Sequence, residues 1–312
     1  MLAEEEINSA GKMKIKIIFE DTQSISGNSV NAYIKLTTAD NVPVVMPFLS
    51  GETAPLVPLG ERDKVIIFSP TATTSVLATG GNYSFKLRES NSVHAGKITD
   101  VMLERNDTKI GLIYSNVEAC KDFVRFFKSS AVLKNITIVT EELYESKATD
   151  MRTQLEKIKE SNTSAFYTCG LYQDLALVFK QAKEIGVNKK GYSFTTFENN
   201  KLFELAGNGS VEGVIYTVSQ LDCKNAASFC GNYRKIFKSE PDYRAAFDYD
   251  GVRLVARAIE TNGYSVGGIM QGLLAIKNFT GASGTTSFDA EGNAQKDVVV
   301  HIVKDGKFVE YS

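Results

Sequence analysis

Short apolar runs alternate with segments of helical spacing along most of the chain. The clearest apolar runs are residues 44–46, 65–68, 109–114 and 165–168. Apolar side chains recur at helical spacing in residues 28–38, 93–104, 118–128 and 174–185. Runs of the first kind predict buried strands, and segments of the second kind predict amphipathic helices. Because each connection is long enough for a crossover, the alternation predicts an α/β fold with parallel strands.

This alternation occurs in two successive cycles. The first includes further expected strands at residues 13–20 and 82–88, and an irregular polar segment, 89–92, separates it from the second. After Val218 the pattern changes to three expected helices, at residues 225–238, 243–261 and 266–276. The chain ends in two apolar segments joined by Lys304-Asp305-Gly306, which is typical of a β-hairpin. We therefore expect a two-lobed protein whose chain crosses between the lobes several times.

Two hydroxyl-rich turns follow neighbouring strands of the first cycle. The strand at 44–46 leads to Leu49-Ser50-Gly51-Glu52-Thr53, and the strand at 65–68 leads to Ser69-Pro70-Thr71-Ala72-Thr73-Thr74-Ser75. Parallel strands end at the same edge of a sheet, where ligands bind. Helices that begin at this edge offer free N–H groups to an anion. The pair of turns favours a site for one small anionic group; the alternative is that Ser50, Thr53 and Thr73 only cap helices.

Composition excludes several classes of protein. The 312 residues are 43% hydrophobic and 23% charged, which is typical of globular domains, and the length suits two of them. The net charge is −2 and the basic residues are dispersed, so the sequence indicates no basic patch that would bind nucleic acid. No apolar run approaches the roughly 20 residues of a membrane helix, and the acidic residues 1–12 do not form a signal peptide.

No enzyme motif is present, and we expect neither catalysis nor a cofactor. The only histidines, His94 and His301, have no G-x-S-x-G motif to accompany them, and no G-x-G-x-x-G fingerprint follows a strand. The four cysteines show no C-x-x-C spacing, so we expect no structural metal site. Cys223 and Cys230 either form a disulfide in an oxidising compartment or remain free thiols.

Eight segments in order resemble the type I periplasmic binding proteins of the leucine/isoleucine/valine-binding class, the solute receptors of ABC importers. They include FLSGET (residues 48–53), VIIFSPTATT (65–74), TDMRTQLEKIKESN (149–162), LAGNGSVEGVIY (205–216) and YDGVRLVARAIE (249–260). The resemblance implies two Rossmann-like lobes with parallel sheets, joined by three crossing segments. The implied lobes are residues 1–90 with 219–292, and residues 91–218 with 293–312.

The resemblance also implies a function. A small amino acid, a branched-chain one by default, would bind in the cleft between the lobes and cause hinge closure. The partners would be the membrane permease subunits, and the protein would be a monomer, either periplasmic or lipid-anchored outside the cell. Two alternatives remain: the sensor lobe of a signalling system, or a binder of a small carboxylic acid or amide.

Site residues follow from the resemblance position by position. Ser50, next to Leu49, matches the serine that binds the ligand carboxylate. Thr73 matches the threonine that contacts the head group, and Thr71 would contribute backbone groups. In the second lobe, Ala119 stands where the family often has a tyrosine, and Tyr172 follows Gly170-Leu171 where the family often has Gly-Tyr-Tyr. Glu198 is the candidate acid for the ligand ammonium; without it in the cleft, a plain carboxylic acid is favoured.

The family carries an export signal and a first strand before the region that matches Met1. We expect this chain to lack both. Because that strand is central in the sheet, its loss predicts unpaired backbone groups and exposed apolar faces on the two neighbouring strands.

Overall fold

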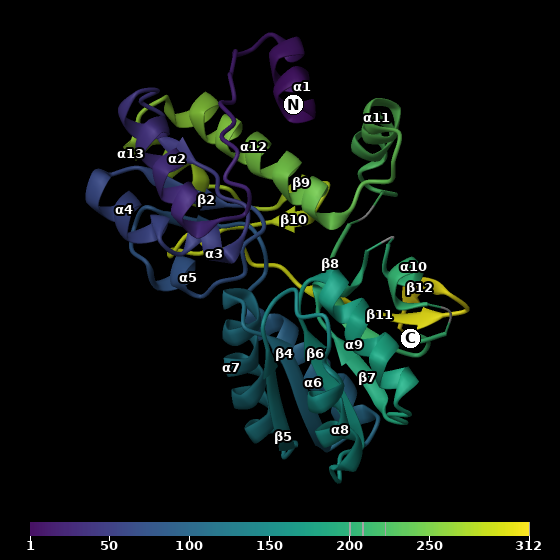
Figure 1. Cartoon of the computed structure of the whole chain (residues 1–312). Helices are drawn as coiled ribbons and strands as arrows, with labels where there is room; N and C mark the ends of the chain where they lie inside the picture. Colours follow the sequence, from purple (N-terminus) through teal and green to yellow (C-terminus); the bar gives the residue numbers. More distant parts are fainter. Residues whose placement is uncertain (200, 208, 222, 312) are drawn as a thin grey trace. The chain divides into compact units, whose positions relative to one another are not determined.

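The chain folds into two units, each with helices packed around its own sheet (Figure 1). The computed structural model describes residues 1–199, 201–207, 209–221 and 223–311. Unit 1 comprises Met1–Ser90 and Ser219–Asp297, and unit 2 comprises Asn91–Val218 and Val298–Ser312, so the chain passes between them three times.

The expected boundary after residue 292 is shifted to Asp297. Residues 293–297 stay with unit 1 because their hydrogen bonds lie there. The Ala294 N–H donates to the Lys86 carbonyl at 2.8 Å, and Lys296 Nζ donates to the Ser283 carbonyl at 2.8 Å.

Unit 1 contains a three-stranded parallel sheet in the order β1-β2-β3. Strand β2 is completely buried, as is typical of a parallel sheet covered by helices. The strands are β1 (Val44–Val45), β2 (Ile66–Ser69) and β3 (Ser84–Lys86), with a hairpin of β9 (Phe279–Gly281) and β10 (Gly284–Thr286). The helices are α1 (Leu2–Ala10), α2 (Ser26–Thr38), α3 (Ser50–Thr53), α4 (Leu56–Asp63), α5 (Val76–Thr79), α11 (Ala227–Phe237), α12 (Tyr243–Asn262) and α13 (Val266–Leu274).

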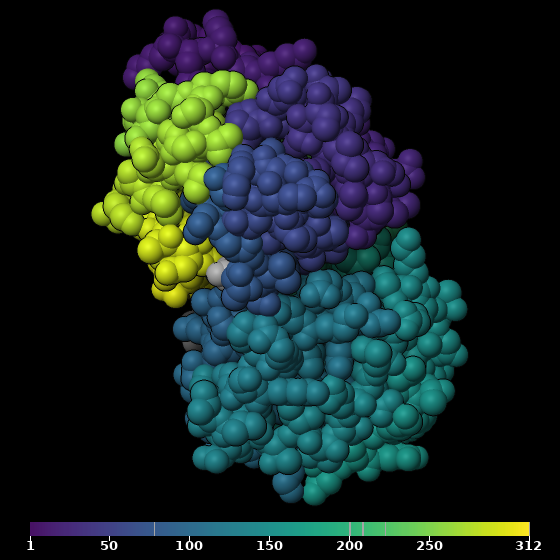
Figure 2. Space-filling model, turned by 90° about the vertical axis from the view of Figure 1, so that its left-hand side faces the viewer, coloured from purple at the N-terminus to yellow at the C-terminus, as the bar shows by residue number. Residues whose placement is uncertain are grey.

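The strand expected at residues 13–20 does not form. This segment has no ladder partner in the described part of the chain. Side chains of α1 satisfy two of its backbone groups instead: the Ile15 N–H donates to Asn8 Oδ1 at 2.8 Å, and the Ile17 N–H donates to Glu4 Oε1 at 2.9 Å. The N-terminal residues, purple in Figure 2, lie against the yellow-green helices of unit 1, in agreement with the packing of α1 on α12.

Unit 2 contains a seven-stranded sheet in the order β12-β11-β8-β7-β6-β4-β5. The β4–β8 ladders described are parallel, and the expected C-terminal hairpin pairs β11 and β12 antiparallel. The strands are β4 (Lys109–Ser115), β5 (Thr137–Tyr144), β6 (Ala165–Cys169), β7 (Lys190–Ser193), β8 (Ile215–Ser219), β11 (Val298–Lys304) and β12 (Lys307–Glu310). The helices are α6 (Asn91–Glu104), α7 (Glu118–Leu133), α8 (Arg152–Glu160), α9 (Tyr172–Glu184), the 3₁₀ turn η1 (Thr195–Phe197) and α10 (Leu202–Ala206).

An aromatic stack anchors α7 to the sheet of unit 2. Phe123 and Phe127 lie four residues apart on one face of the helix and are fully buried. The ring of Phe123 stacks on Tyr167 of β6 with centroids 4.9 Å apart. This packing fixes the first turn of α7 at the carboxyl edge of the sheet.

Two disulfides are present. Cys223 pairs with Cys230, which decides between the two alternatives left open by the sequence. Cys120 pairs with Cys169, a bridge that sequence spacing did not predict. Within the described ranges, no helix combines the length and apolar character required to span a bilayer.

Candidate functional site

The two hydroxyl-rich turns of unit 1 lie side by side, as expected. We call them turn 1 (residues 46–50, after β1) and turn 2 (residues 70–75, after β2). Three hydrogen bonds join this region: Ser69 Oγ donates to the Pro47 carbonyl at 3.0 Å, Thr71 Oγ1 donates to the Phe48 carbonyl at 2.6 Å, and the Thr73 N–H donates to Ser50 Oγ at 3.2 Å. These bonds hold the two turns as one rigid surface at the carboxyl edge of the sheet.

Ser50 does not cap a helix. The N-cap of α3 is Leu49, and its N–H donates to Glu52 Oε2 at 3.0 Å. Ser50 Oγ instead accepts the Thr73 N–H, and its own hydrogen has no acceptor among the described residues. Thr73 Oγ1 likewise has no partner there, although Thr73 is only 2% exposed. A hydroxyl can donate one hydrogen bond, so the site retains two unused donors on residues that are largely buried.

Leu49 and Thr71 build the frame of the site. The Leu49 carbonyl accepts the N–H of Glu52 at 3.1 Å and the N–H of Thr53 at 2.9 Å. The Thr71 hydroxyl donates to the Phe48 carbonyl of turn 1, and the Thr71 carbonyl accepts a hydrogen bond from Arg88 Nη1 at 3.2 Å. Leu49 therefore closes the first turn of α3, and Thr71 connects turn 2 to turn 1 and to Arg88.

Arg88 connects turn 2 to Glu89, where the chain leaves unit 1, and to Ser219, where it returns. Its side chain is 6% exposed; Nε donates to Ser219 Oγ at 2.9 Å and lies 3.7 Å from Glu89 Oε1. The same group stacks over the ring of Tyr243, 4.7 Å from its centroid. Sequence reasoning missed this residue because one arginine after a strand gives no signal of such a network.

In unit 2, Ala119 and Tyr172 belong to adjacent turns. Strands β4 and β6 are neighbours, and α7 and α9 begin just beyond their carboxyl ends. Ala119 lies in the first turn of α7, and Tyr172 is the first residue of α9. The Cys120–Cys169 disulfide joins the two turns. The half-buried Tyr172 hydroxyl has no hydrogen-bond partner in the part of the chain that is described.

The carboxylate of Glu198 is engaged within unit 2. Glu198 Oε2 accepts the Tyr216 hydroxyl at 2.6 Å and lies 2.7 Å from His301 Nδ1. Burial, reinforced by the negative charge of Glu198, raises the pKa of Tyr216 far above its usual range, so this phenol remains a donor. The side chain of Glu198 therefore bonds to residues of β8 and β11. Its role toward a ligand ammonium stays a prediction.

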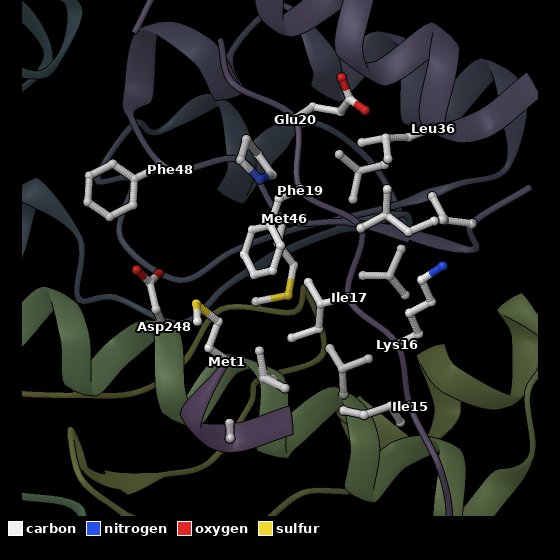
Figure 3. Close-up of a pocket in the computed structure, with 18 of the residues that line it drawn as sticks. Met1, Ile15, Lys16, Ile17, Phe19, Glu20, Leu36, Met46, Phe48 and Asp248 are labelled. Carbon is white, nitrogen blue, oxygen red and sulfur yellow. The ribbon is translucent and has the colours of Figure 1, made fainter. Parts of the chain in front are cut away.

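A cavity of about 1180 Å³ lies within unit 1, apart from Ser50, Thr71 and Thr73. Figure 3 shows Ile17, Phe19 and Met46 around it, with the carboxylate of Asp248 at one side. The cavity adjoins β1, which pairs only with β2 in the described sheet.

Asp248 makes the stability of unit 1 depend on pH. Burial, and secondarily the charge of Asp242, raises the pKa of Asp248 to about 7. The pKa in the folded protein is higher than that in the unfolded chain. Asp248 therefore contributes its full stabilisation of the fold below about pH 4, and this stabilisation is lost as the pH rises through 7. We expect Asp248→Asn to raise the melting temperature at about pH 8 and to flatten its decline above about pH 5. Melting curves across this range test the prediction, with the exposed Asp40→Asn as control; equal slopes in both variants contradict it.

Comparison with known proteins identifies the family. A sequence profile described as "Periplasmic binding protein" matches residues 1–307. The chain belongs to the periplasmic binding protein family. It is similar to the leucine-, isoleucine-, valine-, threonine- and alanine-binding protein of Pseudomonas aeruginosa, with 22% identity over 312 residues, covering 94% of this chain and 80% of the relative.

Solved structures of periplasmic binding proteins share the fold. The branched-chain amino acid transporter substrate-binding protein LivJ of Streptococcus pneumoniae, in complex with isoleucine, is 27% identical with a TM-score of 0.89, covering 98% of this chain and 90% of that one. A solute-binding protein of Rhodopseudomonas palustris, in complex with benzoate, is 16% identical with a TM-score of 0.87, covering 99% and 89%. The chain thus has the type I periplasmic binding protein fold and is a solute-binding receptor of the ABC transporter type.

Proposed function

We propose that this periplasmic binding protein delivers a small amino acid, by default a branched-chain one, to an ABC importer. The observation that carries the proposal is the pair of unused hydroxyl donors of Ser50 and Thr73, held together by the bond between the Thr73 N–H and Ser50 Oγ. The Pseudomonas and Streptococcus relatives carry names that describe branched-chain amino acids as ligands.

The two donors suit a carboxylate. Hydrogen bonds to an ionised oxygen are shorter and about twice as strong as those between neutral groups. Ser50 and Thr73 are buried, so their hydroxyls act where water competes weakly for the ligand. Because turn 1 and turn 2 are already joined, the binding surface needs little reordering before it accepts the ligand.

A plain carboxylic acid is the second candidate. The observation that favours it is the engagement of Glu198 by Tyr216 and His301, since an amino acid also needs an acid for its ammonium group. The Rhodopseudomonas structure of the same fold contains benzoate, an acid without an ammonium.

Closure of the two units around the ligand completes the proposal. The carboxylate is held by unit 1, and unit 2 contributes Tyr172 and the turn of Ala119. Three passages of the chain between the units provide the hinge segments. The closed, monomeric receptor then meets the permease subunits outside the cytoplasm, in the periplasm or on a lipid anchor.

A thermal-shift screen tests the ligand class. We expect L-leucine, L-isoleucine or L-valine to raise the melting temperature. If Glu198 keeps its bonds to Tyr216 and His301, we expect benzoate and branched aliphatic acids to raise it instead. A ligand at about 100 times its Kd adds about 2.7 kcal/mol to the free energy of unfolding. A cooperative melt that no carboxylate shifts contradicts the proposed function.

A further inference from the structure

The Cys120–Cys169 disulfide connects two turns that carry predicted ligand contacts. Cys120 lies in the first turn of α7, directly after Ala119, and Cys169 is the last residue of β6. Both cysteines are buried, at 2% and 0% exposure, and their Cα atoms are 5.6 Å apart. The bridge spans 49 residues of sequence, so it joins two separate strand-to-helix connections.

Further contacts gather at the same point of the sheet edge. The Tyr144 hydroxyl, at the end of β5, donates to the Cys169 carbonyl at 3.2 Å. Thr196 Oγ1, in the turn after β7, donates to the Gly170 carbonyl at 2.5 Å. A Cβ at Gly170 would lie 2.1 Å from the Tyr144 hydroxyl, so the turn accepts only glycine there without rearrangement. The connections after β4, β6 and β7 and the last residue of β5 therefore meet at Cys169 and Gly170.

We propose that the Cys120–Cys169 disulfide positions the ligand-facing edge of unit 2, holding the turn of Ala119 against the turn that leads to Tyr172. This inference rests on the proposed function. A covalent link between two turns removes conformations that the ligand would otherwise have to exclude on binding. The bridge is thus a positioning element for affinity, formed once the protein reaches an oxidising compartment.

The second disulfide supplies a matched control. Cys223 and Cys230 are only seven residues apart, and their bridge lies at α11 of unit 1. Cys230 packs with Leu2, Ala3 and Phe229 rather than with any predicted ligand contact. Cys120→Ala/Cys169→Ala and Cys223→Ala/Cys230→Ala therefore each remove one bridge, but only the first pair touches the ligand-facing edge.

Two measurements test the proposal on the full chain. Calorimetric titration with L-leucine and with benzoate should show an affinity about tenfold lower for the first variant and unchanged for the second. Without ligand, hydrogen exchange should become faster in residues 116–121 and 170–174 of the first variant, while strands β4 and β6 keep their protection. If neither probe binds the unmodified protein, the proposed function fails, and the exchange measurement still decides on positioning. Unchanged exchange in these turns, or faster exchange throughout unit 2, overturns the inference.

Discussion

Replacing Ser50 and Thr73 together by alanine should reduce ligand affinity at least about 100-fold. Each hydroxyl is expected to donate to the ligand carboxylate, and a hydrogen bond to a charged group contributes about 1.5–3 kcal/mol. Losing both therefore costs about 3–6 kcal/mol, and each 1.4 kcal/mol is about a factor of ten in Kd. Calorimetric titration with the ligand found in the thermal-shift screen measures the change.

The matched control for this variant replaces Ser26 and Thr38, two exposed hydroxyl residues of α2. Its Kd should equal that of the unmodified protein. A Ser50→Ala/Thr73→Ala protein that folds and binds with unchanged Kd contradicts the assignment of the site to turn 1 and turn 2.

The largest stability effect is expected at Arg88. Replacing it by methionine removes the guanidinium beside the buried Glu89, together with the bonds to Ser219 and the Thr71 carbonyl. Breaking a buried ion pair by removing one partner costs about 3–5 kcal/mol, because the other charge stays in a medium of low dielectric constant. The midpoint of urea unfolding should fall, and ligand affinity should fall with it, since Arg88 holds turn 2 through the Thr71 carbonyl.

Arg62→Met is the control for the ion pair. Arg62 forms two bonds to Asp63, at 2.7 and 2.8 Å, but its side chain is 65% exposed. Water and salt screen such a pair, so the urea midpoint should not change measurably. Equal midpoints for the Arg88 and Arg62 variants would show that the buried cluster does not stabilise unit 1.

The sequence predicted the strands and helices where hydrophobic periodicity and local bonding agree. The apolar run at 65–68 became the fully buried β2, and the helix expected at 118–128 formed and extended to Leu133. The segment at 13–20 had an equally clear pattern but formed no strand, because a strand requires a hydrogen-bonding neighbour and α1 side chains took two of its N–H groups.

The candidate site was predictable only in part. Hydroxyl-rich turns after neighbouring strands signalled that Ser50 and Thr73 would lie together, because parallel strands end at one sheet edge. Cys120 and Cys169 gave no such signal, since their pairing depends on how β4 and β6 bring distant turns together. The orientation of Glu198 was also hidden, because its partners Tyr216 and His301 lie far away in the sequence.

The central claim is that turn 1 and turn 2 recognise a carboxylate. The most direct test is calorimetric titration with compounds that separate the two charged groups: L-leucine, 4-methylpentanoate and benzoate, against 3-methylbutylamine and benzylamine. The first three contain a carboxylate, whereas the two amines contain only a cation. We predict that at least one carboxylate binds and that neither amine does; an amine that binds as tightly as the matching carboxylate would contradict the account.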